Sequence, residues 1–313
     1  MMQCTSPITG YRAVEGGGIV QSVQKGYADQ HLTVRCGQCI GCRLERSRIW
    51  AIRSVHEASL YDKNIFATLT YDDDNLPWRG NLQRPDITNF FKRLRKKTAK
   101  IRTFYCGEYG DETKRPHYHA LIFNYCPDDK ELMFVKDGHR YYRSEKLDKI
   151  WRKGHVNFSD EVTFSNASYT AGYVTKKATG KHAKDKYQWI DPDTGEVHEI
   201  TPEFQGQSLK PGIGQPWIEK WLWDVYTKDE IVIDGTAMRP PRYYDQQCEK
   251  LAPELWADVQ RRRKEKYIKH RKENENGPYY TSKEDPDEYY GSGRQMFAKN
   301  RITLSKQKDR KEE

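Results

Sequence analysis

The chain has 313 residues, of which 36% are hydrophobic and 32% charged, and its mean hydropathy is −1.00. This composition rules out an integral membrane protein, because no stretch approaches the roughly 18 apolar residues of a spanning helix. The polar start MMQCTSPITG predicts no secretory signal. A net charge of +9 with 21 tyrosines suits a partner that has phosphates and exposed bases, although a generic basic protein has the same composition.

The first half of the chain predicts alternating helices and strands after an irregular start over residues 1–33. Apolar residues recur at helical spacing from Gly41 to Leu60, and a basic amphipathic helix is expected from Ile87 to Thr98. Runs of β-branched and aromatic residues predict strands over 65–71, 101–108 and 117–123. Because a short polar loop joins the last two strands, we expect them to form an antiparallel hairpin.

The second half is more polar. Helices are expected over 145–151, 167–177 and 217–226, and strands over 155–164 and 231–233. Residues 182–216 are rich in Pro, Gly and polar side chains, which predicts a long loop or insertion. A charged helix is expected from Leu251 to Asn276 with a loose polar tail behind it, and its run Arg261–Lys272 is either a solvated face or a nucleic-acid contact.

These elements predict an α+β fold, an antiparallel sheet with helices on one face, because the strands come in hairpins. We expect three parts: an N-terminal cysteine-containing segment and helix packed on the core (1–60), the core itself (61–245, with the polar insertion near 182–216), and a basic helical extension with a loose tail (246–313). Seven cysteines without a secretion signal favour a reducing cytoplasm over a disulfide framework.

The segment RPHYHALIF, residues 115–123, carries the sharpest chemical signal. His117 and His119 are two apart on a predicted strand, so both imidazoles project to one face while Tyr118 points to the other. Folding the hairpin brings the carboxylate of Glu108 towards them. Two imidazoles and a carboxylate around an ion leave positions open for a phosphate oxygen, and the ion polarises a phosphodiester. The alternative is a chance pair of histidines without a metal.

The segment SYTAGYVTKK, residues 168–177, predicts a nucleophile. Tyr169 and Tyr173 are four apart and share one face of the expected helix, and Lys176 and Lys177 follow in the next turn. A neighbouring ammonium favours the phenolate, which is the reactive form of tyrosine. Attack on a DNA phosphate gives a phosphotyrosine ester that keeps the bond energy, so the strand can be rejoined. The alternative is a pair of core aromatics at helical spacing.

A cysteine run predicts a second metal site. Cys36, Cys39 and Cys42 are spaced C-x2-C-x2-C, and a tetrahedral structural Zn²⁺ needs a fourth ligand, for which Cys4 and His31 are the candidates. Reduced thiols at the start of a helix are the alternative. An iron–sulfur cluster uses the same thiolates but has no redox rationale here. The other three cysteines are expected to be packing residues: Cys106, Cys126 and Cys248.

The order FATLTY, GEYG, RPHYHALIF and YTAGYVTKK resembles the HUH endonucleases of rolling-circle replication. These carry a His-hydrophobic-His strand and a helix with one or two tyrosines. The chain is most similar to the two-tyrosine replication initiators of microviruses, in particular of the gokushovirus branch, which CGQCIGCRLERSRIWAIR, PGIG and PPRYYD also resemble. Two positions depart from the pattern: Tyr118 fills the middle position between the histidines, and Gly172 precedes the second tyrosine, where related phages often have a basic residue.

The resemblance implies a small antiparallel sheet and a divalent ion, Mg²⁺ or Mn²⁺, at Glu108, His117 and His119. It implies that Tyr173 attacks single-stranded DNA at the phage replication origin, that Tyr169 serves a second transfer, and that Lys176 and Lys177 support the phosphate charge. The nick leaves the enzyme on the 5′ end and frees a 3′ hydroxyl for a host DNA polymerase.

Further expectations concern partners. The basic helix offers contacts to the DNA backbone: Lys92, Arg93, Arg95, Lys96 and Lys97. No G-x-x-x-x-G-K-[ST] loop occurs in the sequence, so unwinding needs a host helicase in the bacterial cytoplasm. Two rivals stay open: a non-catalytic zinc-containing nucleic-acid-binding protein, and a metal phosphodiesterase that uses water without a covalent step.

Overall fold

In a computed structural model of the chain, the structure describes residues 4–15, 18–98, 100–136, 138–176, 187–191 and 193–274. The chain divides into two compact units, one made of residues 1–45 and 249–313 and the other of residues 46–248. The three-part division expected from the sequence stays a prediction, and the expected tail from Gly277 onward lies outside the described residues.

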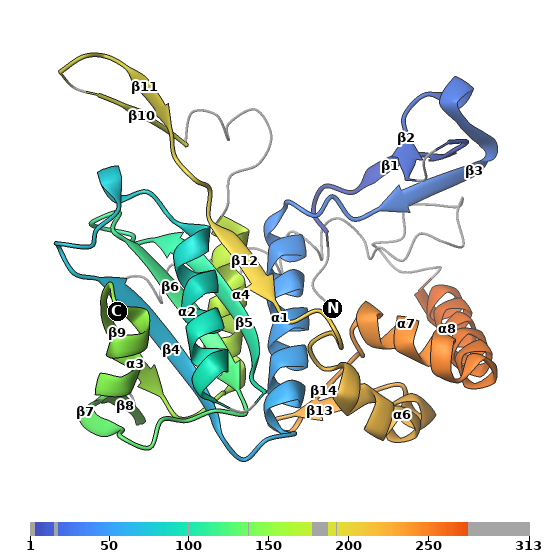
Figure 1. Cartoon of the computed structure of the whole chain (residues 1–313). Coiled ribbons are helices and arrows are strands. Elements are labelled where there is room, and N and C mark those ends of the chain that lie inside the picture. The colour runs from blue at the N-terminus through green and yellow to red at the C-terminus, as the bar shows by residue number, and fades with distance from the viewer. Residues whose placement is uncertain are drawn as a thin grey trace. The chain divides into compact units, whose positions relative to one another are not determined.

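The larger unit is built on a seven-stranded sheet with the order β12-β5-β6-β4-β9-β8-β7, in which all neighbours are antiparallel (Figure 1). Its strands are β4 (Asn64–Tyr71), β5 (Arg102–Tyr109), β6 (Pro116–Phe123), β7 (Glu131–Lys136), β8 (His139–Arg143), β9 (Gly154–Ser159) and β12 (Phe204–Gln207). The expected strands over 65–71, 101–108 and 117–123 are present within one residue, and the last two form the expected hairpin. The α+β class is therefore confirmed.

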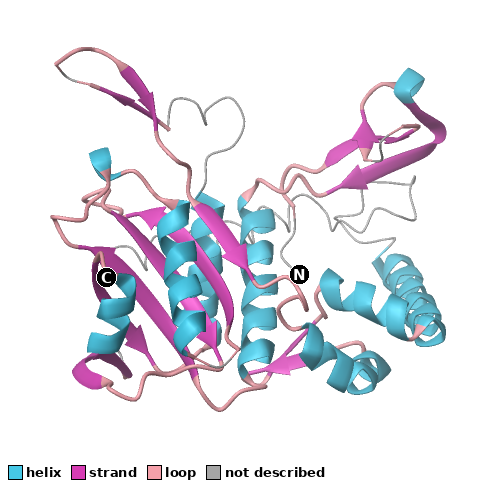
Figure 2. Ribbon diagram, in the orientation of Figure 1, coloured by secondary structure: helices cyan, strands magenta, loops and turns pink. Residues whose placement is uncertain are grey.

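Helices cover both faces of this sheet (Figure 2). On one face, α2 (Arg84–Lys97) and α3 (Glu145–Trp151) pack with Tyr118 and Ile122. On the other face, α1 (Ile40–Ala58) and α4 (Phe164–Lys176) pack with Leu121 and Phe123. The expectation of helices on one face is wrong, because β6 is buried at nearly every position and a strand that is apolar on both sides has to be covered on both sides.

Two segments expected to lack regular structure contain strands. Within 182–216, β10 (Gln188–Ile190) and β11 (Val197–Glu199) form a hairpin, and β12 pairs with β5 at the edge of the main sheet. Within residues 1–33, β1 (Ile8–Ala13), β2 (Ile19–Val20) and β3 (Gly26–Val34) form an antiparallel sheet. These strands are short or rich in polar residues and glycine, so they lack the alternation by which a strand is recognised.

Other boundaries differ from expectation. The strand expected over 155–164 ends at Ser159 because α4 begins at Phe164. The charged helix is α8 (Pro253–Asn274), and α7 (Arg242–Leu251) precedes it as a helix that the sequence analysis missed. The remaining elements are η1 (Val23–Lys25), η2 (Trp78–Gly80), α6 (Gln215–Lys228), β13 (Ile231–Ile233) and β14 (Thr236–Met238). Within the described ranges, every helix is too short or too polar to span a bilayer.

The PGIG segment, residues 211–214, has a structural role against α1. Glu57 and Arg102 form a buried ion pair, and the second carboxylate oxygen of Glu57 accepts from the Gly214 N–H at 2.7 Å. Arg102 also donates to the Gly212 carbonyl at 3.1 Å, and Arg53 donates to the Ile213 carbonyl at 2.9 Å. A buried ion pair is stable only when such further hydrogen bonds satisfy both groups, so this segment and the helix depend on each other.

Candidate functional site

The β5–β6 hairpin brings the predicted metal ligands together. Its register pairs Glu108 with His117 and places Cys106 opposite His119, so the three ligand side chains share one face of the sheet. The Glu108 Oε1 atom lies 2.5 Å from His117 Nε2 and 3.0 Å from His119 Nε2. The ligand atoms of the three residues all lie within 4.8 Å of one another, as a shared ion requires.

The outer nitrogens of both imidazoles are also bonded. His117 Nδ1 lies 3.2 Å from the Arg115 carbonyl, which only accepts, so Nδ1 carries the hydrogen and Nε2 keeps its lone pair. His119 Nδ1 lies 3.0 Å from the hydroxyl of Thr68, which is opposite it on β4. The lone pair of His117 Nε2 therefore faces a carboxylate oxygen, and only a cation or a proton between the two makes that contact favourable.

Burial supports a cation at this place. Glu108 is 3% exposed, and within the described part of the chain its Oε2 atom is buried without a hydrogen-bond partner. A buried carboxylate is costly unless it is paired or coordinates a metal. Two imidazoles and one carboxylate suit a divalent cation and leave coordination positions open. The donor set therefore fits the ion that the sequence predicts.

Helix α4 brings a tyrosine to the ligands. The helix starts at a reciprocal cap, because Thr163 N–H donates to Asn166 Oδ1 at 2.9 Å and Asn166 N–H donates to Thr163 Oγ1 at 3.2 Å. Further along the helix, the ring of Tyr169 lies edge-on to the His119 ring with centroids 5.2 Å apart. Tyr169 is 49% exposed, so a phenol that solvent and substrate reach lies beside the candidate metal ligands.

The other members of the predicted nucleophile set are described less fully. Tyr173 and Lys176 belong to the last turn of α4, where the structure describes the backbone alone. Lys177 lies outside the described residues. Their assignment as nucleophile and cations stays a prediction.

Two nearby groups are excluded from ionising easily. Burial, with the neighbouring charge of Glu108 as a further cause, raises the pKa of the Cys106 thiol, which agrees with its expected packing role. Burial also raises the pKa of Tyr118 to about 12. Its hydroxyl lies 2.8 Å from that of Tyr71 and donates to the Gln83 carbonyl at 2.8 Å, on the face away from the histidines. The sequence analysis assigned no role to Thr68; a threonine at alternate positions of FATLTY, level with the histidines, is the signal for it.

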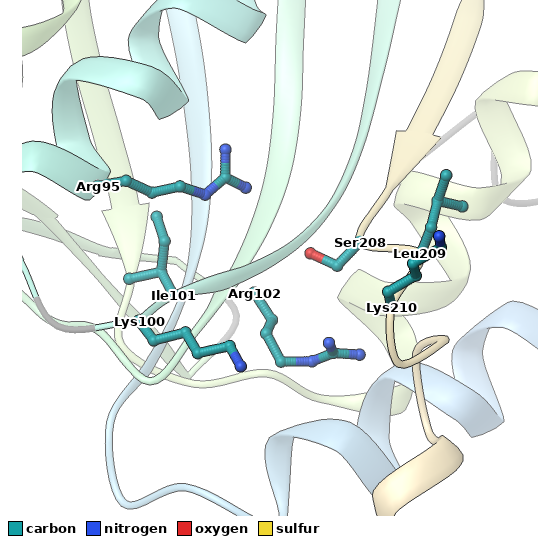
Figure 3. Close-up of a pocket in the computed structure, with 7 residues that line it drawn as sticks. All are labelled: Arg95, Lys100, Ile101, Arg102, Ser208, Leu209 and Lys210. Atoms are coloured by element: carbon teal, nitrogen blue, oxygen red, sulfur yellow. The ribbon is translucent and has the colours of Figure 1, made fainter.

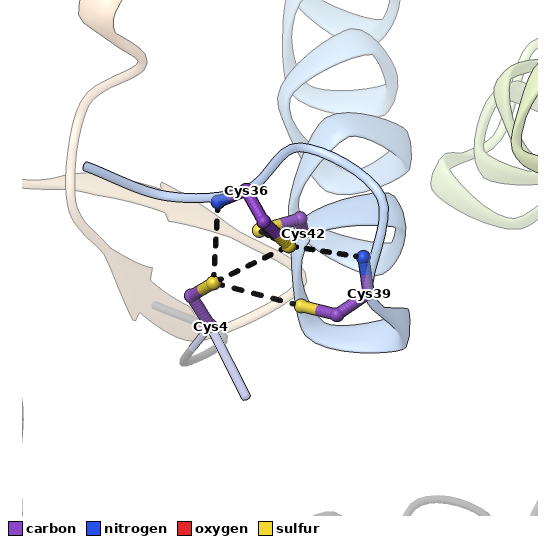
Figure 4. Close-up of side chains that lie close together, drawn as sticks. All are labelled: Cys4, Cys36, Cys39 and Cys42. Atoms are coloured by element: carbon purple, nitrogen blue, oxygen red, sulfur yellow. Dashed lines mark hydrogen bonds between the residues drawn. The ribbon is translucent and has the colours of Figure 1, made fainter. Parts of the chain in front are cut away.

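The four N-terminal cysteines also converge. Cys4, Cys36, Cys39 and Cys42 have their sulfurs within 4.8 Å of one another at the start of α1 (Figure 4). Cys4 therefore takes the fourth position expected from the spacing. His31, the other candidate, is not in this group, and its ring lies against Tyr11 on the neighbouring strand.

The predicted DNA-contact residues of α2 separate into two kinds. Arg93 donates to the carbonyls of Ile150 and Trp151 at 2.7 and 3.0 Å and so connects α2 to the end of α3. The other four are exposed: Lys92, Arg95, Lys96 and Lys97. The helix therefore presents a basic surface, from which Arg93 is partly withdrawn.

A basic pocket lies at the opposite end of β5 from Glu108. Its volume is about 360 Å³, and Figure 3 shows Arg95 reaching in from α2 while the segment after β12 faces it. The lining residues are Arg95, Lys100, Ile101, Arg102, Ser208, Leu209 and Lys210. Four of these side chains are cationic and none is acidic, so the pocket suits an anion.

Comparison with known proteins places the chain in a family. Residues 64–178, which include the metal ligands and most of α4, match the family of the replication-associated protein ORF2. The chain is 37% identical over 270 residues to the replication-associated protein VP4 of Bdellovibrio phage phiMH2K, a match that covers 82% of this chain and 80% of that protein. No solved structure matches the chain.

Two further relatives have similar descriptions. The replication-associated protein ORF2 of Spiroplasma virus 4 is 31% identical over 254 residues, covering 76% of this chain and 74% of the relative. The replication-associated protein ORF4 of Chlamydia phage 1 is 30% identical over 229 residues, covering 70% of this chain and 54% of the relative. The chain therefore belongs to the replication-associated proteins of microvirus-like phages.

Proposed function

We propose that this chain is the initiator endonuclease of phage rolling-circle replication, which nicks single-stranded DNA at the origin by tyrosine attack and later rejoins the strand. The observation that carries the proposal is the position of Tyr169, edge-on to His119 of the Glu108–His117–His119 set. A phenol beside an open ligand set suits transfer of a phosphate to tyrosine. Membership of the replication-associated family supports the same activity.

The ion in this proposal is Mg²⁺ or Mn²⁺, which when bound neutralises charge on the scissile phosphate. Glu108 and the two histidines hold the ion, and the Thr68 hydroxyl and the Arg115 carbonyl fix the rings from behind. The tyrosine oxygen forms a bond to phosphorus and the bond from phosphorus to the 3′ oxygen breaks. The phenol proton is lost and the 3′ oxygen gains one, which leaves a 5′-phosphotyrosine and a free 3′ hydroxyl.

Two tyrosines one turn apart on α4 support two successive transfers, Tyr169 and Tyr173 each serving one. In the proposal Lys176 and Lys177 offset negative charge on the phosphate, since they follow the second tyrosine directly. Rejoining is the reverse reaction, in which a 3′ hydroxyl attacks the phosphotyrosine and releases the phenol.

The DNA partner is supported by the basic surface of α2 and by the pocket at the start of β5. We assign the backbone contacts to the exposed cations of α2 and to Lys100 and Lys210 of the pocket, since Arg102 is already paired with Glu57. The proposal places the reaction in the bacterial cytoplasm, where a host helicase unwinds the duplex and a host polymerase extends the 3′ hydroxyl.

Covalent trapping tests the proposal. Incubation of the chain with a labelled origin oligonucleotide and Mn²⁺ should give a denaturation-resistant adduct. The variants Tyr169→Phe and Tyr173→Phe should each weaken the adduct and the double variant should abolish it while DNA binding persists. Tyr27→Phe is the matched control, since Tyr27 is 43% exposed on β3 and has no role in the proposal.

Each rival gives a different outcome in the same assay. A water-using phosphodiesterase cleaves the oligonucleotide without an adduct, and a non-catalytic binding protein shifts it without cleavage. An adduct that survives in the double variant would show that neither tyrosine is the nucleophile.

A further inference from the structure

We propose that Cys4, Cys36, Cys39 and Cys42 hold one structural Zn²⁺ that closes the N-terminal sheet, a role beyond the DNA chemistry. The sulfur of Cys4 lies 3.5 Å from that of Cys36 and 3.7 Å from that of Cys39, and the sulfurs of Cys36 and Cys42 lie 4.0 Å apart (Figure 4). In a tetrahedral site with zinc–sulfur bonds of about 2.3 Å, the sulfurs lie about 3.8 Å apart. The four side chains therefore already have the spacing of a single-ion site.

The same spacing argues against the other uses of clustered cysteines. A disulfide has its sulfurs about 2.05 Å apart, and no disulfide joins these four residues. An iron–sulfur cluster distributes its cysteines over several iron atoms, which holds the sulfurs farther apart than one shared ion does. Thiolates select zinc over the harder cations that suit imidazole and carboxylate ligands, so this site and the Glu108 site select different ions.

Backbone donors point at the sulfurs. The N–H groups of Cys36 and Cys39 donate to the sulfurs of Cys4 and Cys36, each at 3.3 Å, and Thr5 N–H donates to Cys39 Sγ at 3.3 Å. Hydrogen bonds of this kind stabilise thiolates, which are the form that binds metal. Gly37 has a φ of 72°, in the left-handed region that favours glycine, and so permits the tight turn between the first two cysteines of the run.

The N-terminal sheet needs a clamp at this place. Cys4 precedes β1 and Cys36 follows β3, and Ile8 pairs with Val34 at the open end of the sheet. In the three strands only Gly10 and Ala13 are buried, and Ile8 is 41% and Val34 is 40% exposed. Small units without an apolar core depend on disulfides or metals, and zinc binding contributes its free energy directly to folding.

Metal analysis of the full chain tests the inference. The chain, produced in zinc-containing medium and purified under reducing conditions, should carry one equivalent of zinc by mass spectrometry of the elements. Cys39→Ser and Cys42→Ser should each lose it. Cys126→Ser is the matched control, because Cys126 is a half-buried cysteine outside the cluster, and this variant should keep the full equivalent.

A second measurement on the unaltered chain guards against variants that fail to fold. Removing zinc with a mercurial reagent or a chelator should make the four cluster thiols alkylate, as mapped by peptide mass spectrometry. It should also increase hydrogen exchange over residues 8–34 while residues 102–123 stay protected. The inference is wrong if the native chain carries no metal and these thiols alkylate as fast as Cys126, or if it carries iron in place of zinc.

Discussion

Single side chains behind the ligands orient the imidazoles of the candidate metal centre. Thr68 contacts neither DNA nor metal in the proposal, yet its hydroxyl lies 3.0 Å from His119 Nδ1 and so selects the orientation of that ring. Groups of this kind raise metal affinity by holding a ligand in its binding geometry. Thr70, two residues along the same strand, donates instead to the His155 carbonyl at 3.2 Å. The two threonines therefore provide a matched pair for a test.

Thr68→Val should weaken Mn²⁺ binding by about 10–100-fold, because His119 loses its orienting partner. Thr70→Val should leave the affinity unchanged, since its hydroxyl bonds to backbone on β9. Calorimetric titration of both variants and of the unaltered chain with Mn²⁺ gives the comparison. Equal affinities for all three proteins would show that Thr68 does not position the ligand.

His56 is a second residue whose environment makes a measurable prediction. It is 5% exposed, its ring stacks on Trp217 with centroids 3.5 Å apart, and its Nδ1 lies 3.0 Å from the hydroxyl of Tyr244 in the PPRYYD segment. Burial lowers the pKa of His56 to about 3. The folded chain therefore keeps this imidazole neutral at a pH where the unfolded chain, with a pKa of about 6.5, protonates it.

The stability that this residue contributes is present above pH 6.5 and is lost as the pH falls towards 3, because only the unfolded state takes up the proton. The loss amounts to about 1.4 kcal/mol for each pH unit in that window. Urea unfolding at pH 7.5 and pH 5.5 should show a smaller decrease for His56→Gln than for the unaltered chain. An identical decrease in both proteins would contradict a buried neutral imidazole.

At the scale of elements, the sequence predicts what local patterns determine. The triad Glu108, His117 and His119 was found because alternation and a short hairpin loop place side chains without knowledge of the rest of the fold. Thr68 and the edge strand β12 were missed because their pairing partners are distant in sequence. FQGQ has one buried apolar residue, Phe204, and becomes a strand only beside β5. The second face of helices followed from the same long-range packing.

Two glycines in neighbouring elements are expected to respond oppositely to substitution. A Cβ at Gly172 in α4 would lie 3.8 Å from Ser47 Oγ, an ordinary contact, whereas one at Gly154 at the start of β9 would lie 2.4 Å from backbone atoms. Gly154 also has a φ of 137°. Gly172→Ala should therefore stabilise the fold by about 0.5–1 kcal/mol, because alanine favours helix.

Gly154→Ala should destabilise the fold by more than that amount, since the backbone conformation and the contacts both exclude a side chain. Thermal unfolding of the two variants against the unaltered chain measures both effects. A loss of stability in Gly172→Ala would mean that α4 needs a glycine for its packing, and no loss in Gly154→Ala would mean that the β9 start rearranges easily.

At the scale of the whole molecule, charge connects the two ends of β5. Glu108 lies near one end of the strand, and the basic pocket begins at the other end with Arg102. A single DNA strand bound at the proposed metal centre carries phosphates beyond the one that is cut, and these need cations away from the site. Lys100 and Lys210 meet this need because no ion pair involving either of them is found among the described residues.

The double variant Lys100→Gln/Lys210→Gln should therefore weaken binding of an origin oligonucleotide and reduce its salt dependence. Each lost contact to a single strand lowers the slope of log affinity against log salt by about 0.7, so the pair should lower it by about 1.4. Fluorescence anisotropy over a range of salt concentrations measures the slope. Lys149→Gln is the control, since Lys149 is exposed and paired with Glu145 on α3; an unchanged slope in the double variant would remove the pocket from the DNA path while leaving the tyrosine chemistry untouched.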